Sequence, residues 1–370
     1  MNTATTRQTP NRRLEILASR LTEIQVDAIL VTNETNVGYL SGFTGDSSYL
    51  LVQPGRTAIL TDGRYETQIA AECPQLETAI RPPGQGMLDL IKELLSGTDL
   101  GRIGFESAHV SVAEFAQLRQ KCPNVEWVQT SGVVEDQRII KDASEIEITR
   151  QAVRIAERTF QSVVAKLRPD WSEQEIAYEL ESTMRFLGAS GVSFSPIVAA
   201  GPSGALPHYH SSPNPIGDAA TLLIDWGAFY QGYASDITRT LHREHASDRF
   251  RRAYDAVLEA QLTAIQAIRP GAAAKDVDEA ARQTLQKAGL GDAFKHGLGH
   301  GTGLEIHEAP RLSAISDETL QTGMIITVEP GVYFEGDFGI RIEDDVLVTE
   351  TGHEVLSTLP KGLDECRMML

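Results

Sequence analysis

Acidic residues set into apolar, β-prone stretches are the strongest constraint on how this chain can fold. Residues 222–224 and 237–240 have the composition of two strands, and residues 230–232 between them are typical of a hairpin turn. If the hairpin is centred between positions 230 and 231, Asp225 and Asp236 lie opposite each other on one face. Because like charges across a sheet repel and an unpaired buried charge is costly, we expect a cation or a shared proton between them.

A second stretch, residues 325–348, repeats the arrangement. Glu329 comes after an apolar strand, residues 335–337 form a Gly-containing turn, and Glu343 lies on the returning strand. A hairpin centred on Gly336 places Glu329 opposite Glu343. The sequence therefore predicts two acid pairs on two hairpins.

The repeat extends upstream of both hairpins. Pro169 and Gly188 are 19 positions apart, and so are Pro270 and Gly289, with a helical stretch inside each pair. Two preceding segments also have apolar side chains at helical spacing, namely residues 144–167 and 247–268. Each half consists of helix, helix and hairpin, which predicts two similar half-domains facing each other across a pseudo-twofold axis.

Composition limits the class of protein. The 370 residues, 41% of them hydrophobic, are enough for two globular domains, and the net charge of −18 argues against a nucleic-acid or anionic-membrane surface. Three widely spaced cysteines, Cys73, Cys122 and Cys366, form neither a disulfide framework nor a zinc motif. Residues 1–13 lack the apolar core of a signal peptide, and no run of about 18 apolar residues occurs. We expect a cytoplasmic protein that binds neither nucleic acid nor membrane.

The pattern of elements predicts an α/β domain over residues 1–131, a linker over 132–141 and an α+β domain with the internal repeat over 142–370. Asp142 and Glu145 have the spacing of a capping box and open the second domain. The first domain has no acid pair or histidine cluster at ligand spacing, so we expect it to shape or cover a site. Its predicted elements are a helix at 12–25, strands at 26–31 and 125–128, and a hairpin of 48–52 and 57–61.

Histidines lie in loops ahead of both hairpins. A single loop histidine is usually a surface residue, but His208 and His307 occupy comparable places in the two halves. Glycines alternate around His300 in residues 295–303, without the GK[ST] or helix-opening GxGxxG pattern of a nucleotide site. Glycine at this density permits close backbone approach, which suits a histidine delivered to a metal in a tight pocket.

The two hairpins and this histidine together offer a ligand set. Four carboxylates carry too much negative charge for one divalent ion, whereas two divalent cations satisfy both charge and ligand number. The oxygen-rich set favours Mn²⁺, with Co²⁺, Zn²⁺ or Fe²⁺ as alternatives. The predicted metal ligands are Asp225, Asp236, His300, Glu329 and Glu343.

Over almost its whole length, the chain resembles the creatinase and prolidase-like metallopeptidases of the "pita-bread" fold. The motifs are IDWGAFYQGYASDITRT, HGLGHGTGLEIHE, TVEPGVY and GIRIEDDV, with RIIKDASEIE, TNVGYLSGF and LTDGRY ahead of them. The resemblance implies the same five ligands. It also implies four further site residues, His208, His296, His307 and Arg341. The N-terminal domain and His296 are similar to the proline-specific branch, which comprises Xaa-Pro aminopeptidases and Xaa-Pro dipeptidases.

The activity implied by the resemblance is dinuclear-metal hydrolysis of the Xaa-Pro bond at the N-terminus of a peptide with proline in second position. The aminopeptidase is the first expectation and the dipeptidase the alternative. Glu329 would be both ligand and proton shuttle, and His208 and His307 would stabilise the oxyanion or hold the substrate. His296 and Arg341 would orient the residues around the metals. Relatives also suggest a homodimer in which residues 1–131 limit peptide length.

Two rival functions make different predictions. A metal-free binding protein on the same fold predicts broken ligands, and all five are intact. A serine hydrolase using Ser203 would need glycine where Ala205 stands in the nucleophile-elbow pattern. A chelator separates the classes, because it silences a metallopeptidase and spares a serine enzyme.

Overall fold

The computed structural model describes residues 9–369, which form two compact units. The first unit ends at Arg138 and the second begins at Ile139. Residues 135–138, predicted as linker, form a short helix of the first unit, where Asn36 Oδ1 accepts a hydrogen bond from Arg138 at 2.8 Å. Within the described residues, every helix is too short or too polar to cross a bilayer.

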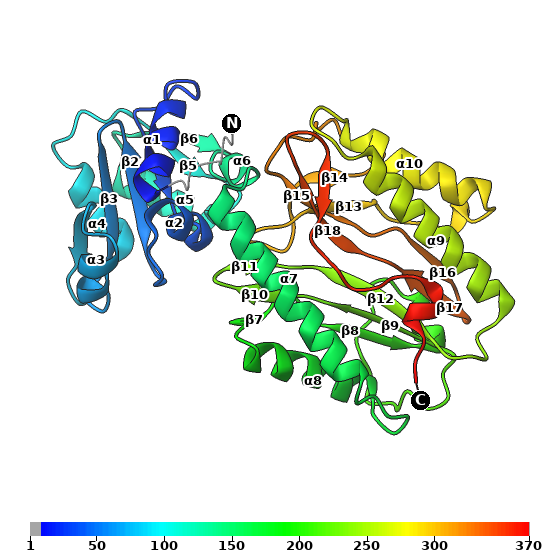
Figure 1. Cartoon of the computed structure of the whole chain (residues 1–370). Helices are drawn as coiled ribbons and strands as arrows, with labels where there is room; N and C mark the ends of the chain where they lie inside the picture. Colours follow the sequence, from blue (N-terminus) through cyan, green and yellow to red (C-terminus); the bar gives the residue numbers. More distant parts are fainter. Residues whose placement is uncertain (1–8, 370) are drawn as a thin grey trace. The chain divides into compact units, whose positions relative to one another are not determined.

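The N-terminal unit is an α/β domain built on a mixed sheet in the order β4-β3-β2-β1-β5-β6 (Figure 1). The predicted helix, strands and hairpin are confirmed, and β2 pairs antiparallel with β3. All four residues of β1 are buried, as expected for a strand with neighbours on both sides and a covered sheet. Its elements are α1 (Pro10–Arg20), β1 (Ala28–Val31), α2 (Glu34–Ser41), β2 (Tyr49–Gln53), β3 (Arg56–Asp62), α3 (Glu66–Glu72), β4 (Glu77–Arg81), α4 (Met87–Leu95), β5 (Arg102–Glu106), α5 (Val112–Lys121), β6 (Glu126–Thr130) and α6 (Glu135–Arg138).

The second unit contains the predicted helical repeat. The first helix begins at a capping box, in which the Asp142 side chain accepts from the backbone N–H of Glu145 and the Glu145 side chain accepts from that of Asp142. The second helix of each half ends just before Gly188 or Gly289, both of which have positive φ. The helices are α7 (Ala143–Val164), α8 (Glu173–Phe186), α9 (Asp248–Ala267) and α10 (Ala274–Lys287), and each pair flanks the strands of its own half (Figure 1).

The strands of this unit form small sheets that meet along the two hairpins. Their sheet orders are β11-β10-β7, β12-β9-β8, β14-β13-β15-β18-β19 and β16-β17. The strands are β7 (Gly191–Val192), β8 (Ile197–Ala200), β9 (Thr221–Trp226), β10 (Ala228–Tyr230), β11 (Tyr233–Ala234), β12 (Ile237–His242), β13 (Gly299–Gly301), β14 (Glu308–Leu312), β15 (Ile325–Val328), β16 (Gly331–Phe334), β17 (Phe338–Arg341), β18 (Asp344–Val348) and β19 (His353–Val355).

The register predicted for the first hairpin is wrong. Asp225 pairs with Thr238 rather than with Asp236, because Gln231 takes φ 47° and forms the two-residue turn with Gly232. The turn therefore falls one residue later than predicted, and the pairing shifts by two. Since side chains alternate with a period of two, this shift keeps both acids on the same face.

The second hairpin has the predicted register. Val328 pairs with Asp344 and Gly331 with Arg341, so Glu329 lies across from Glu343, and Gly336 occupies the turn with φ 74°. The two hairpins are joined directly, because the backbone N–H of Glu343 donates to the Thr238 carbonyl at 3.1 Å.

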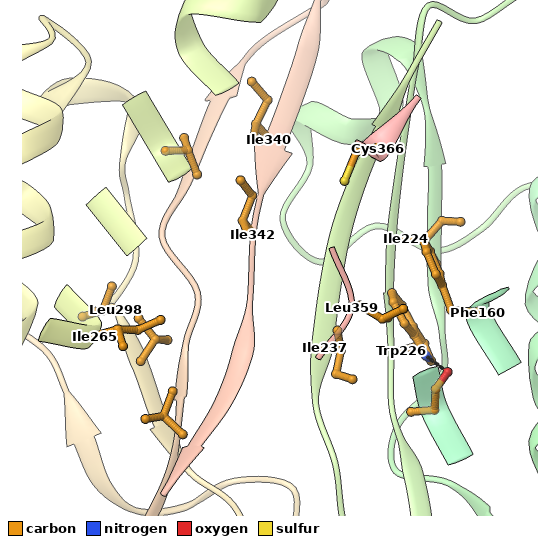
Figure 2. Packing of buried hydrophobic residues seen from close by; sticks show 14 of the residues in the cluster. Phe160, Ile224, Trp226, Ile237, Ile265, Leu298, Ile340, Ile342, Leu359 and Cys366 are labelled. Carbon is orange, nitrogen blue, oxygen red and sulfur yellow. Dashed lines mark hydrogen bonds between the residues drawn. The ribbon is translucent and has the colours of Figure 1, made fainter. Parts of the chain in front are cut away.

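A continuous apolar core lies between the strands and helices of each half. In the first half, Trp226 stacks on Phe160 with ring centroids 4.4 Å apart, and its Nε1 donates to the Ala156 carbonyl at 2.9 Å (Figure 2). In the second half, Leu298 and Ile265 lie close together (Figure 2). Burial of such side chains stabilises the fold by about 1.5–3 kcal/mol each, which holds the hairpins rigid around their acids.

Candidate metal centre

One cavity of about 440 Å³ in the second unit gathers every site residue expected from the sequence. These residues come from the first hairpin, the second hairpin, the loop before β9 and the segment around β13 and β14. The cavity is lined by Asp225, Asp236, His300, Glu329 and Glu343, together with His208, His296, His307 and Arg341.

Three of the expected ligands are close enough to share a metal ion. Asp236, His300 and Glu343 are buried, and each offers a ligand atom within 4.8 Å of the others. Glu329 is also near, since its Oε1 lies 3.5 Å from His300 Nε2, and Asp236 Oδ2 lies 3.6 Å from the same nitrogen. Oxygen and imidazole nitrogen at these separations suit a divalent cation.

Asp225 completes the group differently. Its Oδ2 accepts a hydrogen bond from Arg341 Nη2 at 2.7 Å. Its Oδ1 is buried and has no hydrogen-bond partner among residues 9–369. A buried carboxylate oxygen without a hydrogen-bond donor is costly. A cation bound to Oδ1 would remove this cost, so Asp225 fits a metal site.

Glycines on either side of His300 allow its strand to approach its neighbours closely. A Cβ at Gly299 would lie 2.1 Å from the Thr327 carbonyl oxygen, and one at Gly301 would lie 2.1 Å from that of Ala309. His300 Nδ1 lies 3.0 Å from the Gly301 carbonyl, which can only accept, so this nitrogen carries the proton. Nε2 is thereby left as a lone-pair donor facing the acids.

The electrostatics of the cluster show that its charge is not balanced by the protein. Burial, together with repulsion from neighbouring acids, raises the pKa of Asp236 and of Glu343 well above the ordinary carboxyl range. Burial also raises the pKa of Glu329, to about 8, and lowers that of His300 to about 3. Without a cation the acids would hold protons near neutral pH, and a divalent cation would restore their charged form.

Two threonines that sequence reasoning missed hold the ligands in place. Thr238 Oγ1 donates to Glu343 Oε2 at 2.6 Å and accepts from Arg341 Nε at 3.1 Å. Thr327 Oγ1 accepts from the backbone N–H of His300 at 3.1 Å. Thr238 is two positions after Asp236 and Thr327 two positions before Glu329, so the period-two rule could have found them.

Tyr333 is a third residue that sequence reasoning did not single out, although it belongs to the TVEPGVY motif. Its hydroxyl accepts from Arg341 Nη1 at 2.8 Å and lies 3.0 Å from His296 Nε2. His296 Nδ1 lies 2.8 Å from the Gly297 carbonyl, and burial lowers the pKa of this histidine to about 4. Nε2 of the neutral His296 ring therefore accepts a hydrogen bond from the Tyr333 hydroxyl. A chain of hydrogen bonds thus runs from His296 through Tyr333 and Arg341 to Asp225.

The remaining histidines and the apolar side chains form the open part of the cavity. His208 and His307 are exposed, and the His307 ring meets the His300 ring edge-on with centroids 4.4 Å apart. Burial lowers the pKa of His307, and the nearby Arg311 charge lowers it further. The apolar part of the lining, which the sequence did not predict, consists of Phe194, Ile197, Pro207, Ile306 and Leu312.

Two buried acids of the N-terminal unit, Asp62 and Glu106, are bound by their own neighbours. Asp62 pairs with Arg64 and Arg81, each at 2.9 Å, and the buried Glu106 accepts from the backbone N–H groups of Thr32 and Asn33. Such carboxylates are structural, in contrast to those of the second unit.

Comparison with known proteins identifies the two domains. Residues 147–350 match Metallopeptidase family M24, and residues 13–140 match the Creatinase/Prolidase N-terminal domain. The chain is 36% identical over 351 residues to the Xaa-Pro dipeptidase of Pyrococcus furiosus, covering 95% of this chain and 99% of that protein. The solved Xaa-Pro dipeptidase from Bacillus anthracis superposes with a TM-score of 0.92 at 38% identity, covering 96% of this chain and 99% of the other. The X-Pro aminopeptidase from Thermotoga maritima gives a TM-score of 0.86 at 37% identity, covering 93% and 99%.

These similarities extend over both units and confirm the expected pita-bread architecture. Family membership implies the use of a divalent metal, and the buried group of Asp236, His300 and Glu343 is consistent with it. The chain therefore belongs to metallopeptidase family M24 and is a metallo-exopeptidase with a creatinase/prolidase N-terminal domain.

Proposed function

We propose that this chain hydrolyses the Xaa-Pro bond of short peptides with two divalent metal ions, Mn²⁺ first among them. The observation that carries the proposal is the convergence of two acid pairs, one imidazole and four supporting side chains on a single cavity. Asp225, Asp236, His300, Glu329 and Glu343 would hold the ions, which supply Lewis acidity toward the scissile carbonyl and the attacking water.

Glu329 is the proposed carrier of the proton in this reaction. Its Oε1 lies 3.5 Å from His300 Nε2, so the carboxylate reaches the place where the ions and their water would be held. With a divalent cation bound the carboxylate would be charged, so it could accept a proton from water and pass it to the leaving proline nitrogen.

His208 and His307 are the proposed stabilisers of the carbonyl oxygen. Both are exposed to the open part of the cavity, where a substrate enters. A ring N–H aimed at the developing oxyanion lowers the barrier, and the lowered pKa of His307 keeps that ring neutral. The chain of Tyr333, Arg341 and Asp225 fixes the opposite side of the cavity.

Selection for proline fits the apolar side of the cavity. The nitrogen of an Xaa-Pro bond has no N–H to donate, and the pyrrolidine ring is apolar. Phe194, Ile197 and Ile306 supply an apolar surface for such a ring.

The form of exopeptidase depends on whether the substrate ends at the proline or continues beyond it. The sequence first suggested an Xaa-Pro aminopeptidase, and the relatives have both names. Arg311 also lines the cavity, and its charge is close enough to lower the pKa of both His300 and His307. A guanidinium there can bind the free carboxylate of a dipeptide, which favours the Xaa-Pro dipeptidase.

The test compares three substrates in Mn²⁺-loaded protein: an Xaa-Pro dipeptide, an Xaa-Pro-Yaa tripeptide and an Xaa-Ala dipeptide. We expect hydrolysis of both proline peptides, faster for the dipeptide, and little of the alanine peptide. Arg311→Met should raise KM for the dipeptide more than for the tripeptide, while Arg56→Met on the N-terminal sheet serves as the matched control. Equal rates on the proline and alanine peptides would contradict the proline specificity.

Assembly is a further part of the proposal. We propose a homodimer in which the N-terminal unit limits the length of peptide that enters. The mass of the protein in solution tests the dimer, and rates on a series of longer Xaa-Pro peptides test the length limit. A monomer that hydrolyses long and short peptides equally well would contradict both.

A further inference from the structure

A buried ion pair outside the metal cluster lies beside the loop that presents His307. Lys141 Nζ and Glu308 Oε2 are 2.9 Å apart, and their side chains are only 1% and 6% exposed. We propose that the Lys141–Glu308 pair positions His307 for catalysis, an inference that rests on the role proposed above for His307.

The loop of residues 303–308 is closed on itself by the Glu308 carboxylate. The backbone N–H of Gly303 donates to the Glu305 carbonyl at 3.1 Å, and that of Glu305 donates to Glu308 Oε1 at 3.1 Å. One carboxylate oxygen thus holds the loop, and the other receives Lys141. His307 lies between these anchored positions, so its place depends on their geometry.

Lys141 is itself fixed from two sides. Its backbone N–H donates to the Gly323 carbonyl at 2.9 Å. Its side chain passes Gly303, where an added Cβ would lie 2.9 Å from Lys141 Cε and 2.6 Å from Glu308 Oε2. A side chain at position 303 would push the two charged groups aside, so the absence of a Cβ lets the pair pack directly against the loop.

The His307 ring depends on this loop for its orientation. Among residues 9–369 its side chain makes no hydrogen bond, and its ring packs edge-on against the ring of His300. Removing one partner of a buried pair leaves the other charge unpaired, and relief of that charge moves the chain that carries it. Disruption of the pair should therefore displace His307 while leaving the metal ligands in place.

A double-mutant cycle with His307 separates positioning from general stability. We expect Lys141→Met to lower kcat by on the order of ten-fold at unchanged metal content, as for other residues that support a catalytic group. In a His307→Ala background the same change should have almost no further effect, since the group it positions is gone. Lys141→Arg keeps the charge and should recover part of the rate. Equal losses in both backgrounds would overturn the proposal.

Glu308→Gln provides a second variant with less risk to folding. The amide keeps an oxygen for the N–H of Glu305 and removes the negative charge opposite Lys141. The readout is the NMR resonance of the His307 ring, assigned by comparison with His307→Ala. We expect it to shift, whereas an unchanged resonance would overturn the proposal. This measurement needs no substrate, so failure of the proline specificity and failure of the positioning role are distinguishable.

Discussion

Two neighbouring acids, one just before β18 and one at its first position, have the same burial and opposite electrostatic surroundings. Glu343 and Asp344 are each 1% exposed. Glu343 faces other acids across the cavity, and its pKa is raised by burial and by Glu329 and Asp225. Asp344 faces the other way. Although burial alone would raise its pKa, the charges of Arg239 and Lys361 lower it.

The second acid is neutralised wholly by the protein. Arg239 Nη2 donates to Asp344 Oδ1 at 2.8 Å, Gln261 Nε2 donates to Oδ2 at 2.9 Å, and Lys361 pairs with the same oxygen. Near Glu343 the chain supplies the Thr238 hydroxyl and the charge of Arg341, which also pairs with Asp225. One arginine is too little positive charge for the acids that face the cavity. Burial alone therefore does not mark a metal site; several acids that face one cavity without enough cationic partners do.

The largest expected effect is the loss of activity when a ligand of the uncompensated cluster is removed. Asp236→Ala or Glu343→Ala should lower kcat/KM by more than the roughly 10–100-fold typical of residues that only support a ligand. The fold should be retained, because each change removes repulsion rather than packing. Peptide hydrolysis and circular dichroism of the purified variants are the measurements, and full turnover at unchanged metal content would contradict the ligand assignment.

The compensated acid should respond in the opposite way. Asp344→Asn leaves the buried guanidinium of Arg239 without its counter-charge, so the free energy of unfolding should fall by about 3–5 kcal/mol. The folded fraction should lose far less activity than Asp236→Ala does. Urea denaturation, with Glu343→Gln as the matched control, measures this difference. A larger loss of stability in the metal-free Glu343→Gln protein than in Asp344→Asn would reverse the comparison.

Metal binding should raise the stability of the folded protein only when the acids around Asp236 and Glu343 are intact. Saturation of the native state at 100 times the dissociation constant adds about 2.7 kcal/mol to the unfolding free energy. Thermal unfolding with and without Mn²⁺ should therefore show a higher Tm in the parent and in Asp344→Asn, and no increase in Asp236→Ala. Identical melting temperatures of the parent in both conditions would contradict a metal site in this cluster.

The pH dependence of the metal-free protein tests the same buried charge without any substitution. Glu329 has an ordinary pKa of 4.5 and a pKa of about 8 in the fold, so unfolding releases its proton between these values. Its stabilising contribution is complete below about pH 4.5 and is lost as pH rises to about 8. Denaturation from pH 5 to pH 8 should show falling stability without metal and a flatter profile with Mn²⁺. Parallel profiles would argue against protons on the buried acids.

Much of this fold could be predicted because its signals are local. Helical spacing, the Pro and Gly boundaries and the capping box of Asp142 depend on residues a few positions apart, and all are present. The convergence of the acids could also be predicted, since the period of two keeps Asp225 and Asp236 on one face even though their register was misjudged.

The remaining features depend on conformation or on distant partners. The register of the first hairpin depends on the left-handed conformation of Gln231, which turn composition alone does not specify. Arg239 donates hydrogen bonds to the carbonyls of Leu359 and Pro360, which are more than a hundred positions away in the sequence. Lys141 pairs with Glu308, which is also more than a hundred positions away. No local pattern predicts such pairs.

The most direct test of the uncompensated cluster is a calorimetric titration of the metal-free protein with Mn²⁺ at pH 7, repeated in two buffers of different ionisation enthalpy. Because acids with raised pKa hold protons that a cation displaces, we expect binding accompanied by proton release, and loss of both in Asp236→Ala. Binding without proton release, or unchanged binding by Asp236→Ala, would contradict the uncompensated charge of this cluster.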